Sequence, residues 1–295
     1  MSDVVVTGSR GLLGATLMRV LPEAGFRAVP FTGDIRDPAA VATQIAQAAP
    51  ACVVHAAAMT YVAACERQPQ QAFAVNGGGT KNVVAAARAA GAPVLYISTA
   101  SVFKGDHGDC REEDAPEPTN AYNQSKREGE RHALDYERGM VLRFNMIGIH
   151  PDGSRSQNFF EWLLDGLRAN EDVTLFADVC INPLSNWTVA ALIAKIMTRD
   201  GLGKILHIGS RDVLSKAAIG ELVRARFPGY LGTVRPGSVD AIADGRFRPK
   251  QMWLNTDRAA ALLGTMPTVA QELDTIFAKS RLCLDRSQSL CPRMT

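Results

Sequence analysis

The chain has 295 residues, of which 46% are hydrophobic and 21% charged, a composition typical of a globular protein with one large domain or one domain and a smaller lobe. The net charge is +2 and no dense basic block occurs, which argues against a nucleic-acid partner. The six cysteines form no Cys-x-x-Cys pair, and no apolar leader or run of about 18 apolar residues is present, so we expect no metal site, no membrane span and a cytoplasmic location.

Short β-branched segments alternate with alanine-rich segments of helical length through the first half of the chain. Strands are expected at residues 4–7, 27–31, 52–55, 93–98 and 139–143. Helices are expected between them at residues 12–24, 38–49, 70–90 and 122–136. Because this alternation needs crossover connections, the sequence predicts an α/β fold with a doubly wound parallel sheet of the Rossmann type.

After Gly148 the regular alternation ends, and an amphipathic stretch at residues 158–167 is followed by shorter elements. In this half, one strand at 204–208 is expected to return to the main sheet, and helices are expected at 216–226 and 268–278. We therefore predict three parts: an NAD(P)-binding domain at 1–148, a mainly substrate-binding lobe at 149–279 and a tail at 280–295.

A glycine-rich turn follows the first strand and opens the first helix. Its sequence is Gly8-Ser9-Arg10-Gly11-Leu12-Leu13-Gly14. The three glycines place no Cβ between the backbone and a ligand, and the helix directs its positive end toward a pyrophosphate. Because the turn lies between a strand and a helix, it predicts binding of a dinucleotide.

The second predicted strand ends without the carboxylate that would accept a ribose 2′-hydroxyl and repel a 2′-phosphate. Arg10, inside the turn, carries a guanidinium that could bind that phosphate, although it could also be a solvated loop side chain. We therefore expect NADPH in preference to NADH. Asp34 could bond the adenine amine, and Asp37 is explained equally well as a helix N-cap before Pro38.

Tyr122 and Lys126 are four residues apart on a predicted helix and so share one face. A nearby ammonium favours the phenolate and lowers the pKa of a phenol, which suits general acid–base catalysis. Thr99 follows a predicted strand, at the edge where open α/β sheets place ligands, and its hydroxyl could hold a substrate carbonyl oxygen. Ser98 and Ser101 compete for this role. The spacing alone also fits a surface tyrosine over an exposed lysine.

Taken together, these motifs resemble the extended short-chain dehydrogenase/reductase superfamily, and within it the dTDP-4-dehydrorhamnose reductase branch. Further matching segments are His55-Ala56-Ala57-Ala58, Val75-Asn76, Asp34-Ile35-Arg36-Asp37, Cys65-Glu66, Val102-Phe103-Lys104-Gly105 and Arg248-Pro249-Lys250. Ala63 and Ala100-Ser101 stand where branch members usually carry polar residues near the sugar, so the resemblance extends to the chemistry rather than to dehydrorhamnose itself.

The resemblance implies roles for individual residues. The cofactor would be bound by the glycine turn and by Asp34, Ile35, Ala56, Ala57, Ala58, Tyr122 and Lys126. Tyr122 would transfer the proton, with Thr99 and Lys126 completing the catalytic set. The expected substrate residues are Ser101, Asn145, Asn182 and Arg248; the last two either face the sugar diphosphate or close hydrogen bonds between lobes, and Lys250 is a further candidate cation.

The expected function is NADPH-dependent reduction of a keto group on a nucleotide-linked deoxysugar, with hydride from nicotinamide C4 and the proton from Tyr122, by a homodimer. One alternative is an NAD-dependent nucleotide-sugar epimerase with the same site. Another is a non-catalytic NADP-binding regulatory subunit. Dehydration is disfavoured because Ala100-Ser101 replaces the Asp-Glu pair that dehydratases of the superfamily carry.

Overall fold

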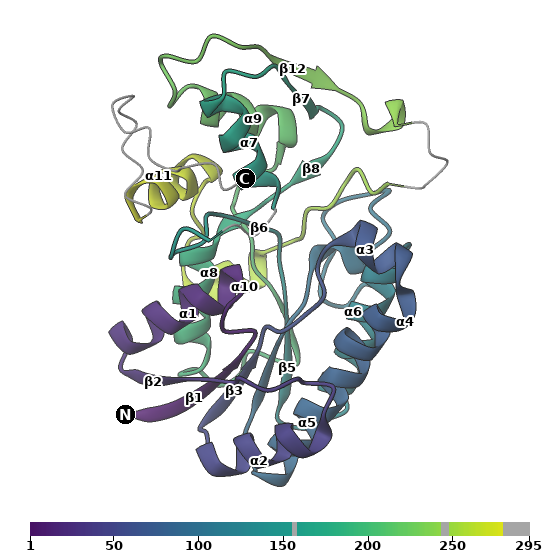
Figure 1. Cartoon of the computed structure of the whole chain (residues 1–295), viewed down its shortest axis with the longest axis vertical. Coiled ribbons are helices and arrows are strands. Elements are labelled where there is room, and N and C mark those ends of the chain that lie inside the picture. The colour runs from purple at the N-terminus through teal and green to yellow at the C-terminus, as the bar shows by residue number, and fades with distance from the viewer. Residues whose placement is uncertain (155–157, 243–247, 280–295) are drawn as a thin grey trace, which may run out of the picture.

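The computed structural model describes residues 1–154, 158–242 and 248–279. Its centre is a six-stranded parallel sheet in the order β10-β5-β4-β3-β1-β2. Figure 1 labels β5, β3, β1 and β2 of this sheet. The strands are β1 (Ser2–Thr7), β2 (Phe26–Pro30), β3 (Cys52–His55), β4 (Val94–Ile97), β5 (Gly139–Arg143) and β10 (Ile205–His207). The chain runs from β1 to β2 on one side and then to β3 on the other, so the sheet has its switch point at the carboxyl ends of β1 and β3. The predicted fold class is confirmed.

Helices cover both faces of this sheet. They are α1 (Leu12–Glu23) and α8 (Asn186–Ile196) on one face, and α2 (Pro38–Ala48), α5 (Thr80–Ala89) and α6 (Ala121–Leu134) on the other. In β1, Val4 and Val6 pack against α1 and α8, whereas Val5 packs against α2 and α5. Successive side chains of a strand point to opposite faces, which explains why a continuous valine run forms a strand buried on both sides.

The predicted helix at 70–90 is interrupted. The segment forms α4 (Pro69–Phe73), a π-helical turn (Ala74–Gly79) and then α5. Close packing explains the glycines of this turn, because a Cβ on Gly77 would lie 2.9 Å from Glu128 Cγ and one on Gly79 2.6 Å from Ile35 Cδ1. The other predicted helices begin and end within two residues of the observed ones.

The second lobe has its own core, formed mainly by α7 (Phe159–Arg168), α9 (Lys216–Arg224) and α11 (Val269–Lys279). These helices pack with short strand pairs, β7 (Val173–Phe176) with β12 (Val234–Gly237) and β8 (Cys180–Ile181) with β11 (Leu214–Ser215). The predicted strand at 204–208 does return to the main sheet as β10.

The smaller elements are α3 (Val62–Arg67), β6 (Met146–Ile147), β9 (Leu184–Ser185), α10 (Asp257–Leu263) and 3-10 turns at Ala100–Val102 and Val239–Ala241. The predicted tail at 280–295 lies outside the described residues. None of the helices in the described ranges is long and apolar enough to cross a membrane.

Candidate active site

The glycine turn after β1 is fixed by close backbone contacts. Gly8 has φ of +67°, and a Cβ there would lie 2.7 Å from the Ala57 backbone. A Cβ on Gly14 would lie 2.0 Å from the Gly8 carbonyl oxygen, and the Gly11 N–H donates to that oxygen at 2.9 Å. Only glycine meets both demands, at Gly8 because of its left-handed backbone and at Gly14 because of the contact.

The amino-terminal end of α1 has no side-chain cap. Gly11 is its N-cap, no side chain caps the helix, and its first turn contains no acidic residue. The unpaired N–H groups and the helix dipole therefore favour an anion at this end. Arg10 is exposed beside it. These features fit the pyrophosphate of a dinucleotide.

A buried hydrogen-bonded set supports the turn from below. The Thr7 hydroxyl accepts the Ala57 N–H at 3.1 Å and contacts His55 Nδ1 at 2.6 Å, and His55 Nε2 contacts the Thr80 hydroxyl at 2.9 Å. Burial and the Lys126 charge lower the pKa of His55 to about 3, so this imidazole is neutral. Ala56, Ala57 and Ala58, the expected ribose contacts, follow directly along the chain and are half-buried.

The residues expected near adenine lie at the end of the loop after β2. Asp34 is exposed and forms an ion pair with Arg36 at 2.6 Å, which lowers the pKa of its carboxyl to about 2. Ile35 is buried. Asp37 accepts the N–H groups of Ala39 and Ala40, so it is the N-cap of α2.

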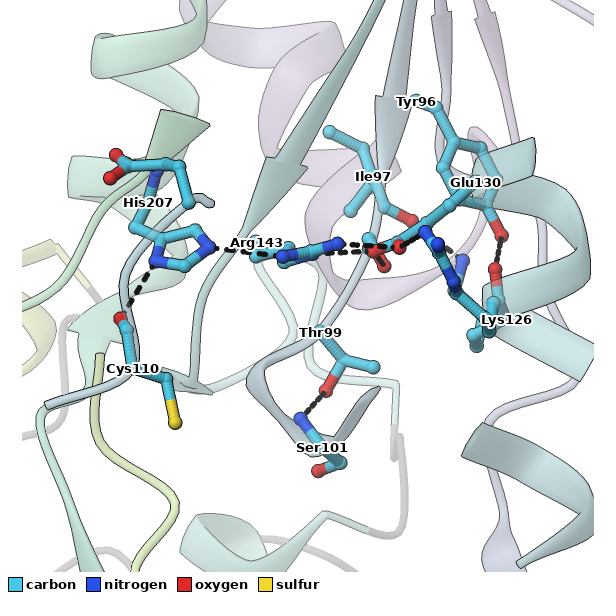
Figure 2. Close-up of polar contacts among 12 residues, drawn as sticks. Tyr96, Ile97, Thr99, Ser101, Cys110, Lys126, Glu130, Arg143 and His207 are labelled. Atoms are coloured by element: carbon cyan, nitrogen blue, oxygen red, sulfur yellow. Dashed lines mark hydrogen bonds and ion pairs between the residues drawn. The ribbon is translucent and has the colours of Figure 1, made fainter. Parts of the chain in front are cut away.

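The start of α6 determines where Tyr122 and Lys126 lie. The Asn120 side chain accepts the Asn123 N–H, so the helix begins there. Contacts with Ile97 and Thr99 then place Lys126 and Tyr122 at the carboxyl end of β4. The Lys126 ammonium donates to the Ile97 carbonyl oxygen at 2.6 Å and lies 4.1 Å from the centroid of the Tyr96 ring (Figure 2). Thr99 follows β4, and its hydroxyl accepts the Ser101 N–H at 3.1 Å.

The expected acidification of Tyr122 is wrong for this structure. Burial raises the pKa of Tyr122 to about 12, the Thr99 hydroxyl opposes this rise, and Lys126 does not contribute. The ammonium is itself affected, since burial lowers the pKa of Lys126 to about 7 against the opposing effect of Glu130. Lys126 is paired with the β4 backbone rather than with the phenol.

A fully buried ion pair lies behind this group. Glu130 receives two hydrogen bonds from the Arg143 guanidinium, at 2.7 and 2.8 Å, and one from the Ser98 hydroxyl at 2.6 Å. Arg143 also contacts His207 Nε2 at 3.3 Å, and His207 Nδ1 contacts the Cys110 carbonyl oxygen at 3.1 Å (Figure 2). The guanidinium can only donate and the carbonyl oxygen can only accept, so a neutral His207 carries its proton on Nδ1. This series of hydrogen bonds thus joins β4, α6, β5 and β10.

The residues expected to face the sugar are not all in one place. Ser101 Oγ contacts Met252 Sδ at 3.8 Å, and the Asn145 amide donates to the Met252 carbonyl oxygen at 2.6 Å, so these two meet on one segment. The Asn182 amide instead bonds the backbone of Ser210 and Leu254 and holds neighbouring segments together. Arg248 is half-buried at the beginning of the last described range.

Sequence reasoning missed two partners at this site. Tyr96 underlies the Lys126 ammonium, and Glu130 anchors Arg143 and Ser98. Glu130 could have been found, because it lies four residues beyond Lys126 and therefore on the same helix face.

A glycine turn of this form on a Rossmann-type sheet, together with a Tyr-x-x-x-Lys helix, is the mark of the extended short-chain dehydrogenases/reductases, and this chain is one of them. The RmlD substrate binding domain family matches residues 1–281. The chain therefore belongs to that family, as the sequence predicted. Relatives named as reductases support the predicted class of enzyme, an NAD(P)-dependent oxidoreductase.

Named relatives agree with this assignment. A dTDP-4-dehydrorhamnose reductase of Streptomyces griseus is 38% identical over 181 residues, which cover 59% of this chain and 58% of the relative. Methionine adenosyltransferase 2 subunit beta of Rattus norvegicus is 32% identical over 155 residues, 49% of this chain and 46% of the relative. The structure of dTDP-4-dehydrorhamnose reductase from Bacillus anthracis in complex with NADP shares the fold, with a TM-score of 0.86, 24% identity and coverage of 94% of this chain and 99% of that chain.

Proposed function

We propose that this protein reduces a keto group on a nucleotide-linked deoxysugar with NADPH. One observation carries the proposal: the glycine turn after β1 and the group formed by Thr99, Tyr122 and Lys126 lie at the carboxyl ends of strands of one parallel sheet. These ends share one edge, so a dinucleotide on the turn would extend toward the phenol.

The cofactor residues of the proposal are those predicted from the sequence. The turn and the end of α1 would bind the pyrophosphate, Asp34 and Ile35 the adenine side, and Lys126 the nicotinamide ribose. Exposed Arg10 would bind the 2′-phosphate, which favours NADPH over NADH. When bound, the nicotinamide supplies the hydride.

The phenol would act as the acid of a reduction. With a pKa of about 12, Tyr122 holds its proton at neutral pH and can give it to an oxygen that becomes negative as the carbonyl is reduced. Thr99 would hold that oxygen.

Replacing Gly8 by alanine is expected to weaken NADPH binding at least roughly tenfold, because the new Cβ would push the turn away from Ala57. Gly25→Ala is the matched control. Gly25 also has a positive φ, +86°, but nothing lies within 4 Å of its Cβ position, so that change should cost about 1–2 kcal/mol of stability and leave binding unaltered. Fluorescence titration and thermal unfolding measure both effects. Equal NADPH affinities of the two variants would contradict the proposed turn site.

Activity is expected to fall as the pH rises through about 7, because Lys126 loses its proton there and with it the charge that would bind the nicotinamide ribose. The profile of kcat/KM reports the free enzyme, in which this pKa applies. Because the folded value lies below the ordinary 10.5, the folded chain binds fewer protons between these values, and Lys126 alone would make the unfolding free energy increase with pH there. In Lys126→Arg the fall of kcat/KM above about pH 7 should disappear. A fall that persists in this variant would assign the titration to another group.

A thermal-shift screen tests the function directly. NADPH and NADH are each combined with UDP-, dTDP-, GDP- and CDP-sugars, because a ligand that binds the native state raises its stability. Pairs that stabilise the protein are then assayed for NADPH oxidation with the corresponding keto-sugar. Absence of both stabilisation and turnover across the panel would refute the proposal.

The half-length similarity to methionine adenosyltransferase 2 subunit beta favours a second candidate, a regulatory subunit that binds NADP without turning it over. NADPH binding without oxidation by any keto-sugar would support it. The epimerase alternative predicts tightly bound NAD in the purified protein.

The proposal also keeps the predicted boundary near residue 148, the homodimer and the cytoplasmic location.

A further inference from the structure

The second lobe contains a lysine whose charge is balanced by no carboxylate of the described residues. Lys216 is the first residue of α9, and its ammonium lies 5.1 Å from the centroid of the Phe159 ring. Within the described part of the chain, this ring is the only partner found for the ammonium. Burial lowers the pKa of Lys216 and no neighbouring charge alters it. A half-buried cation without a counter-ion is unfavourable unless an anion joins it.

Two other cations of this lobe already have carboxylate partners. Lys250, a predicted diphosphate ligand, lies 3.3 Å from Asp178 and 2.5 Å from Asp240. Arg235 likewise lies 2.8 Å from Asp172. An anionic ligand would have to compete with these carboxylates at Lys250, whereas it would meet no such competitor at Lys216.

Lys216 is also close to the segment that meets the expected sugar residues. The backbone N–H of Lys216 donates to the Val179 carbonyl oxygen at 2.9 Å, at the end of the β11–β8 pair. On the other side of β8, Cys180 bridges to Gln251, next to the Met252 that contacts Ser101 and Asn145. Two strand spacings, about 10 Å, thus separate the Lys216 backbone from that segment, so a ligand that reached both would lie across β8.

We infer that Lys216 binds the diphosphate of the nucleotide sugar, an inference that rests on the proposed function. The ammonium rather than the end of α7 would hold the ligand, because the Asn158 side chain already accepts the Phe160 and Glu161 N–H groups and Glu161 adds a carboxyl to the first turn. Cation–π attraction to the Phe159 ring keeps the ammonium at this position.

The test compares Lys216→Met and Lys216→Arg with the wild type. Isothermal titration calorimetry measures the binding of UDP, dTDP, uridine, thymidine and inorganic pyrophosphate to the full chain in the presence of NADP⁺. Lys216→Met should bind the nucleoside diphosphates roughly 10-fold to 100-fold more weakly, the loss expected for one charge-assisted hydrogen bond, with nucleoside and NADP⁺ binding unchanged. Lys216→Arg should retain most of the affinity. Lys81→Met, on exposed α5 sequence of the other lobe, is the control and should bind as the wild type does.

Thermal unfolding separates a binding role from a structural one. Methionine removes a half-buried charge at similar length, so the Tm of Lys216→Met should equal or exceed that of the wild type. A Tm of Lys216→Met several degrees below that of the wild type would overturn the inference. UDP and dTDP affinities equal to those of the wild type would also overturn it, as would a loss of affinity confined to inorganic pyrophosphate. Those results would leave the proposed function standing. A wild type that binds NADP⁺ but no nucleoside diphosphate would overturn both.

Discussion

Tyr122→Phe is expected to lower NADPH oxidation with the correct keto-sugar roughly 100-fold to 10,000-fold, the range that a general acid contributes. The phenol is the proton donor that α6 places at the carboxyl end of β4. Its pKa of about 12 keeps it protonated at neutral pH, so it is ready to donate. Phenylalanine retains the ring and removes that proton, and steady-state kinetics measure the loss.

NADPH affinity, measured by fluorescence titration, should be unchanged in this variant because the glycine turn and Lys126 remain. Tyr230→Phe is the matched control. It removes a tyrosine hydroxyl that donates to the Glu171 carbonyl oxygen in the second lobe and should retain full turnover. Turnover of Tyr122→Phe near the wild-type rate would exclude the phenol from the proton transfer.

The parallel sheet could be predicted because its strands are local patterns. Residues 52–55 and 139–143 are short apolar segments between turn residues, and they form β3 and β5 with the predicted bounds. The break inside the predicted helix at 70–90 could not be found in this way. It depends on Glu128 and Ile35, which are distant in sequence and approach the glycines of the π-helical turn.

The candidate site shows the same limit. Helical spacing correctly places Tyr122 and Lys126 on one face, but spacing says nothing about burial or about what else that face meets. The Ile97 carbonyl oxygen takes the ammonium, and the phenol becomes less acidic instead of more acidic. Asn182 is a similar case, because its amide is used by backbone groups that only the folded chain brings to it.

Glu130→Leu is expected to destabilise the protein by about 3–5 kcal/mol, because Arg143 would remain buried without its counter-ion. Both side chains are fully buried, and the carboxylate also accepts hydrogen bonds from Ser98 and Arg127. For a chain of this size the loss corresponds to a Tm roughly 5–8 °C lower, which thermal unfolding measures.

The same pair predicts a pH dependence of stability. Burial raises the pKa of Glu130, but hydrogen bonds and charge from Arg143, together with Ser98 and Arg127, outweigh burial and lower it below the ordinary 4.5. A carboxyl with a lowered folded pKa contributes stability that is present above the unfolded value and is lost as the pH falls through the folded one. Glu130→Gln should therefore lose less stability than the wild type on acidification below about pH 4.5.

Two further variants identify the cause of the destabilisation by Glu130→Leu. Glu128→Gln, two residues earlier on α6, breaks a more exposed ion pair with Arg131 and should change stability by less than about 1 kcal/mol. Combining Glu130→Leu with Arg143→Met removes both charges and should restore most of the lost stability, since a buried pair replaced by apolar side chains of similar size is often neutral. A double variant as unstable as Glu130→Leu would mean that the ordering of β4, α6 and β5 by these hydrogen bonds, rather than the uncompensated charge, determines the stability.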